Sequence, residues 1–190
     1  AAGQRAHVPV REPGAPDPSN YGDADRWSLV LAPGFGRFGN APGSALRSIG
    51  LLAATTEWVT FADDDVWWES GHLASVLAAA DGRNWGSTLR RIWASESDCI
   101  GVDRFESVGD DRARKVPYEM CDNNCMIFRR EFGVAAAPLY RETRAYNDDR
   151  LMYAFLKQEA GPRGGTGRPT LNQVCPARLV EFFRLNCSPI

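Results

Sequence analysis

The sequence predicts an α/β protein whose sheet contains parallel strands, and the order of its first segments carries this prediction. Residues 27–31 and 55–62 have strand composition, whereas residues 44–54 and 70–80 place apolar side chains at helical spacing. A strand, a Gly-rich loop, a helix, a strand, an acidic run and a helix follow in that order, which is typical of a mainly parallel mixed sheet flanked by helices. Ligands of such sheets bind at the carboxyl ends of strands, where the acidic run begins at Asp63.

The second half of the chain continues the alternation of strands and helices. Residues 87–93 have strand composition, and a further strand starts near Cys121 and closes at Phe128. Helices are predicted from Asp148 or Asp149 to Glu159 and over residues 176–185. The Gly- and Arg-rich residues 161–169 indicate a loop, either an ordinary flexible one or a lid over a diphosphate.

Composition narrows the class of partner. The 190 residues include 22 basic and 24 acidic ones, for a net charge of −2, so no basic excess exists to bind a nucleic acid. No apolar run reaches the ~18 residues of a membrane helix. We therefore expect a cytoplasmic protein without a transmembrane segment, and leave open a peripheral association with a membrane. Five cysteines, an odd number, are expected to be packing residues.

Three consecutive aspartates, Asp63, Asp64 and Asp65, follow the strand at residues 55–62. Clustered carboxylates raise one another's pKa unless a cation lies between them, and Mg²⁺ or Mn²⁺ takes such oxygen ligands. Alternate residues at a strand end share one side, so Asp63 and Asp65 are predicted to bind the metal together. The alternative is a solvated turn in which Asp65 or Ser70 caps the next helix.

Four motifs in order resemble the inverting family 2 glycosyltransferases of the GT-A fold. The resemblance covers residues 40–160 and is carried by residues 47–54 (RSIGLLAA), 57–65 (EWVTFADDD) with 71–73 (GHL), 122–130 (DNNCMIFRR), and 147–151 (NDDRL). It implies a Rossmann-like, nucleotide-sugar-binding fold. It also implies a metal-dependent enzyme that moves a sugar from a UDP- or GDP-sugar, with inversion, to a carbohydrate or other hydroxyl acceptor.

The resemblance also assigns roles. Asp65, helped by Asp63, would hold Mn²⁺ or Mg²⁺ against the diphosphate, and Asp149 would be the general base, with Asp148 tuning it. The remaining donor-site candidates are Arg47, Asp64, Asp122 and Asn123. An alternative interpretation makes Asp148 and Asp149 helix caps, Arg47 a solvated helix residue, and Asp122 and Asn123 turn residues.

The sequence departs from the family at several positions. Ser48 stands where the family has Asn, and Asp148 where it has Glu. The family's opening strand, with its Pro-x-Tyr/Phe-Asn pattern, has no counterpart. We therefore expect one domain over residues 1–190 that either lacks an N-terminal strand segment or has diverged there.

Two other functions stay open on the sequence. An Asp-x-Asp phosphohydrolase would share the acidic motif, but the chain offers no well-placed downstream lysine, since Lys115 and Lys157 are its only two. A non-catalytic nucleotide- or sugar-binding module is the alternative of another class. Trp67, Trp68 and Trp85 are either core residues or sugar-stacking platforms, and burial of tryptophans in general favours the core.

Overall fold

The computed structural model describes residues 44–103, 120–142 and 148–189. By contacts the chain divides into two units. The first unit holds the described residues 44–59, 129–142 and 148, and the second holds 60–103, 120–128 and 149–189. The strand expected at 27–31 and the loop that follows it lie outside the described residues.

The first unit is helical. Helix α1 (Ser44–Ala53) packs against α3 (Arg130–Ala136) and α4 (Leu139–Glu142). It buries Ser44, Ser48 and Leu51, which recur every three or four residues and so share one face. The helix predicted over residues 44–54 is confirmed.

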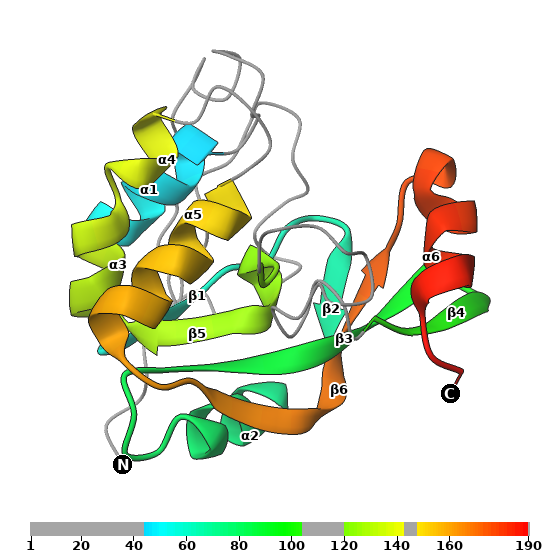
Figure 1. Cartoon of the computed structure of the whole chain (residues 1–190), viewed down its shortest axis with the longest axis horizontal. Coiled ribbons are helices and arrows are strands. Elements are labelled where there is room, and N and C mark those ends of the chain that lie inside the picture. The colour runs from blue at the N-terminus through cyan, green and yellow to red at the C-terminus, as the bar shows by residue number, and fades with distance from the viewer. Residues whose placement is uncertain (1–43, 104–119, 143–147, 190) are drawn as a thin grey trace, which may run out of the picture. The chain divides into compact units, whose positions relative to one another are not determined.

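The strands form one sheet in the order β1-β5-β3-β6-β2, with β4 paired to β3 (Figure 1). Their bounds are β1 Trp58–Thr60, β2 Val66–Trp68, β3 Trp85–Ser95, β4 Asp98–Asp103, β5 Met126–Arg129 and β6 Gly164–Val174. Strands β3 and β6 run parallel, whereas the pairs β2–β6, β3–β4 and β3–β5 are antiparallel. The sheet is mixed, as predicted, with a larger antiparallel share than we expected.

Helices flank the sheet in the second unit. Helix α2 (His72–Ala79) packs against β3 and β6, and α6 (Val180–Asn186) packs against β4. Phe183 of α6 packs with Ile92 and Cys175 in a buried cluster. The fold class predicted from sequence, an α/β protein with a mixed sheet flanked by helices, is confirmed.

The helix predicted from Asp148 to Glu159 is confirmed in two parts. Helix α5 (Asp148–Phe155) continues into a π-helical turn, Leu156–Ala160. It stops at Gly161, whose φ of 80° favours glycine. The last predicted helix is a 3₁₀ turn, Ala177–Leu179, followed by α6.

The loop predicted over residues 161–169 is wrong, because β6 begins at Gly164. A Cβ atom at Gly164 would lie 1.8 Å from the carbonyl oxygen of Ala79, so glycine here lets β6 approach the end of α2. At Gly164, glycine therefore serves close packing, and the lid interpretation is wrong because it required a loop here. The short strands β2 and β4 were also missed.

Trp85 supports the core interpretation. It is 1% exposed, meets Tyr153 edge to face and donates from Nε1 to the Gly161 oxygen at 2.8 Å. Cysteines 121, 125 and 175 are buried thiols. Among the helices in the described part of the chain, none is long and apolar enough to cross a membrane.

Candidate functional site

The acidic run follows β1 in the second unit. The Asp63 amide donates to Asn124 Oδ1 at 2.8 Å, and Asn124 Nδ2 donates back to Asp63 Oδ2 at 3.0 Å. Asp63 and Asp65 are half-buried, whereas Asp64 is exposed. Asp64 and Asp65 lie in a turn rather than in a strand, so the sharing of one side by Asp63 and Asp65 stays a prediction.

A second segment, Asp122 to Asn124, lies against the acidic run. Asp122 caps the 3₁₀ turn Asn123–Cys125, because its Oδ1 accepts from both the backbone N (2.8 Å) and Nδ2 (2.9 Å) of Asn124. Asn124 thus bridges two carboxylates. The interpretation of Asp122 as a turn residue is correct, and its second oxygen also joins a wider network.

The third segment is the start of α5. Asp149 Oδ1 accepts from the backbone N of Asn123 at 3.2 Å. Asp149, Asp122 and Asp63 come from three separate parts of the sequence. Hydrogen bonds through residues 123 and 124 bring the three into one site within the second unit.

A buried arginine, Arg90, organises the network from β3. It is 2% exposed, pairs with Asp103 at 2.9 Å and with Asp122, and donates from Nη1 to Gln173 Oε1 at 2.6 Å. Because an arginine side chain has no hydrogen-bond acceptor, Arg90 contacts the oxygen of the Gln173 amide, and the NH₂ group of that amide points away from Arg90. That group donates to Asp65 Oδ2 at 3.1 Å.

Asp65 carries an incompletely satisfied charge. Its Oδ1 is buried and has no hydrogen-bond partner within the described residues. Burial raises the pKa of Asp65, the Gln173 hydrogen bond opposes that shift, and the charges of Asp63, Asp122 and Asp64 add to it. A carboxylate left in this state fits a divalent cation, which would complete the coordination of the free oxygen.

The protein ligands for such a cation are few. In residues 44–103, 120–142 and 148–189, no three His, Cys, Asp or Glu side chains gather as a ready metal site. Mg²⁺ in particular is commonly held by one or two carboxylates together with substrate phosphates and water. Asp65 and Asp63 fit that kind of partial protein shell better than a closed structural one.

Asp148 lies in the first unit and has different partners from its neighbour. Its Oδ2 accepts from Arg47 Nη1 at 2.8 Å and from Ser44 Oγ at 3.2 Å. The guanidinium of Arg47 and the hydroxyl of Ser44 thus both occupy this one oxygen of Asp148. Arg47, at 17% side-chain exposure, is an ion-paired residue rather than the solvated one of the alternative interpretation.

The other two tryptophans of the acidic segment differ from each other. Trp68 stacks on His72 with 4.8 Å between ring centroids, and His72 contacts Thr170 Oγ1 at 2.8 Å. Burial lowers the pKa of His72 to about 4, so the ring is neutral at pH 7. Trp67 is 41% exposed and lies 5.7 Å from the ring of Trp93, so the core interpretation is wrong for it.

Sequence reasoning missed Arg90, Asn124 and Gln173. One signal was available for Arg90, since Arg90 and Arg91 are the two charged residues in a segment that otherwise has uncharged strand composition. A buried arginine in such a run predicts carboxylate partners. Gln173 carries no comparable signal, because its role depends on the register of β6 against β2 and β3.

Comparison with known proteins gives a fold likeness and no family. No protein-family model matches the chain, and no curated protein matches it. Among solved structures it is similar to 4-diphosphocytidyl-2C-methyl-D-erythritol synthase from Anaerococcus prevotii DSM 20548, with a TM-score of 0.45 and 15% identity. The likeness covers 87% of this chain and 69% of that one.

Proposed function

We propose that this chain is a metal-dependent glycosyltransferase that moves a sugar from a nucleotide-sugar donor to an acceptor hydroxyl with inversion. One observation supports it most. A single hydrogen-bonded network joins Asp63, Asp65, Asp122 and Asp149, which come from three of the motifs that resemble the family 2 enzymes.

Asp65, with Asp63 beside it, would hold Mn²⁺ or Mg²⁺. The ion would neutralise charge that develops on the departing nucleoside diphosphate. The orphaned Asp65 Oδ1 supports this assignment, since a buried carboxylate oxygen without a partner costs free energy until a cation or donor reaches it.

Asp149 is the better candidate for the general base. It would accept the proton of the acceptor hydroxyl as that oxygen bonds to the anomeric carbon. The bond from that carbon to the phosphate oxygen breaks, and its electron pair leaves with the diphosphate. Asp148 is the poorer candidate because Arg47 and Ser44 already occupy its Oδ2.

The donor, acceptor and cofactor follow as parts of the same proposal. The donor is a UDP- or GDP-sugar, and the acceptor is a carbohydrate or another hydroxyl compound. Asn123, Asp64 and Arg47 remain candidates for contacts with the donor, and the protein acts in the cytoplasm.

The test has two stages. Thermal unfolding with UDP, GDP and CDP, each with and without Mn²⁺, identifies the base, because a ligand at 100 times its Kd stabilises the protein by ~2.7 kcal/mol. Asp65→Asn is the matched control and should lose the Mn²⁺-dependent part of that stabilisation. The cognate nucleotide sugars are then incubated with acceptor panels.

The released product decides among the functions. Glycosyl transfer releases the nucleoside diphosphate and yields a glycosylated acceptor. Pyrophosphate release would instead indicate nucleotidyl transfer, and inorganic phosphate a phosphohydrolase. Tight, Mn²⁺-dependent binding without any turnover across the panel would identify a binding module and contradict the enzyme.

A further inference from the structure

A small pocket lies between β3 and β6 in the second unit, where their parallel pairing is irregular. Ser87 pairs with Gly165 and Leu89 with Pro169, so three residues of β6 stand opposite the single residue Thr88. Gly167, one of these three residues, has a φ of 68°. The lining residues are Ser87, Thr88, Leu89, Arg163, Gly165, Thr166 and Gly167.

Hydrogen bonds hold residues 166–168 against β3. Thr88 Oγ1 contacts the Arg168 oxygen at 3.1 Å and Thr170 Oγ1 at 2.8 Å, and Thr166 Oγ1 donates to the same Arg168 oxygen at 2.7 Å. The irregular pairing is therefore a built feature with its polar groups largely matched. A β-bulge of this kind re-aims side chains near functional sites.

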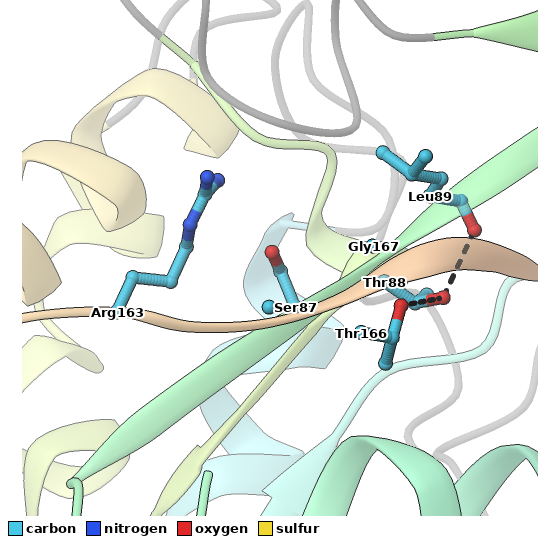
Figure 2. Close-up of a pocket in the computed structure, with 7 residues that line it drawn as sticks. Ser87, Thr88, Leu89, Arg163, Thr166 and Gly167 are labelled. Carbon is cyan, nitrogen blue, oxygen red and sulfur yellow. Dashed lines mark hydrogen bonds between the residues drawn. The ribbon is translucent and has the colours of Figure 1, made fainter. Parts of the chain in front are cut away.

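Ser87 is the exception among these polar groups. It is 3% exposed, yet the described residues offer its hydroxyl no hydrogen bond. Figure 2 shows this hydroxyl and the Arg163 side chain projecting to the same side of the two strands. A hydroxyl that lines a pocket and has no partner among the described residues is a donor available to a ligand.

Arg163 supplies the charge. It is the one charged residue among those that line the pocket in the described structure. Its field reaches the buried thiol of Cys121, whose pKa burial raises and the Arg163 charge lowers. A guanidinium, a hydroxyl donor and the backbone of two glycines form a donor-rich set that suits an oxyanion.

The size of the pocket limits the ligand. Its volume is about 180 Å³, room for roughly six water molecules at ~30 Å³ each. Pockets for drug-sized ligands hold ~300–1,000 Å³. A whole nucleotide sugar does not fit, whereas a phosphate or carboxylate group does.

We propose that this pocket binds a single oxyanion group, a phosphate or a carboxylate, through Ser87 Oγ and the Arg163 guanidinium. None of the metal and base candidates of the proposed function is among the residues that line this pocket. Such a group would be carried by a second substrate or a small-molecule regulator that presents one anion to the β3–β6 pair.

The experiment uses the whole chain without Mn²⁺. Inorganic phosphate and acetate are titrated separately by calorimetry at constant ionic strength, and backbone amide shifts at Ser87, Gly165 and Gly167 report the location. We expect one saturable site for one of the two probes, with shifts at those amides. The probe that binds identifies the source as phosphate or carboxylate.

Two variants and a matched control sharpen the result. Ser87→Ala and Arg163→Gln should each weaken the bound anion about tenfold, the effect of losing a hydrogen bond to a charged group. Arg168→Gln removes the same charge from a position within β6 that does not line the pocket, so the affinity of this variant for the anion should stay within twofold of the wild type. Ser87→Ala should leave the Tm unchanged.

Specific outcomes would overturn the proposal. It fails if neither anion saturates, if Arg168→Gln weakens binding as much as Arg163→Gln, or if the amide shifts cluster elsewhere. Asp65→Asn should bind the anion as wild type does. Failure of the pocket therefore leaves the glycosyltransferase proposal standing, and loss of metal-dependent nucleotide binding leaves the pocket standing.

Discussion

The two ends of the β3–β6 pair surround an arginine in different ways, Arg90 within β3 at one end and Arg163 just before β6 at the other. From Arg90 to Trp93 the register with residues 171–174 is regular, and Arg90 is buried among Asp103, Asp122 and Gln173. Toward Ser87 the register breaks, and Arg163 lines a pocket. Where the pairing is regular, acceptors surround Arg90, and where it is irregular, the strands leave a pocket that Arg163 lines.

The largest expected effect is on the rate of the proposed reaction, at the edge of the closed network. Asp149→Asn keeps side-chain size while removing proton acceptance, so transfer at saturating donor should fall ~10²–10⁴-fold with donor affinity unchanged. Asp148→Asn should cost less, because Arg47 already holds that carboxylate. Near wild-type turnover in both variants would make these aspartates structural and move the base elsewhere, with Asp122 next in line.

Stability distinguishes the two arginines. Arg90→Met leaves Asp103 and Asp122 without a buried guanidinium and should lower the free energy of unfolding by ~3–5 kcal/mol. Arg163→Gln should lower the free energy of unfolding by less than Arg90→Met does, because Arg163 is only half-buried. Chemical denaturation measures both, and equal losses would mean that the two ends of the strand pair do not differ as described.

Gln173 tests whether the closed network positions Asp65. Gln173→Leu keeps the approximate size of the side chain and removes the donor to Asp65 Oδ2, so the Kd for Mn²⁺ with nucleoside diphosphate should rise ~10-fold or more. Calorimetry measures the change, and Gln173→Glu is the companion variant, since it keeps the contact with Arg90 but repels Asp65. An unchanged Kd in the leucine variant would remove Gln173 from the metal site.

The smallest effect concerns pH and the charge on Asp65. Its pKa is raised in the folded state, so the folded protein binds its proton more readily than the unfolded chain, and stability falls as pH rises from 3.8 through the folded pKa. Without metal, Asp65→Asn should therefore raise the Tm on the order of 2 °C at pH 7. The gain should vanish below pH 3.8, and a loss of stability at pH 7 would show that the Asp65 charge is already compensated.

Local patterns in the sequence predicted the elements that depend on local chemistry. The apolar spacing of residues 44–54 and the strand composition before Asp63 were sufficient for α1 and β1. The glycines of residues 161–169 misled, because a glycine needed for close packing and one needed for a loop look the same in a sequence. The structure confirms the α/β class through elements such as α1 and β1, which local patterns predict.

The candidate site was only partly predictable for a related reason. Asp63 and Asp65 were proposed because clustered acids at a strand end call for a cation, whereas Asp122 and Asp149 were proposed from the resemblance to the family 2 enzymes. Gln173 and Arg90 lie 83 residues apart and meet only through the parallel register of β3 and β6. No pattern within either segment specifies that register, so the link from Arg90 to Asp65 required the structure.

Gly164 also has a practical consequence for genetics. Even the single methyl group of alanine would have to displace the backbone at Ala79, so Gly164→Ala strains the junction between α2 and β6 without touching an acid or arginine of the site. Cells that carry this allele should keep the protein's activity at low growth temperature and lose it on a modest upshift. The position thus offers a conditional allele, with which the cellular process that needs this protein can be switched off and its accumulating precursor collected.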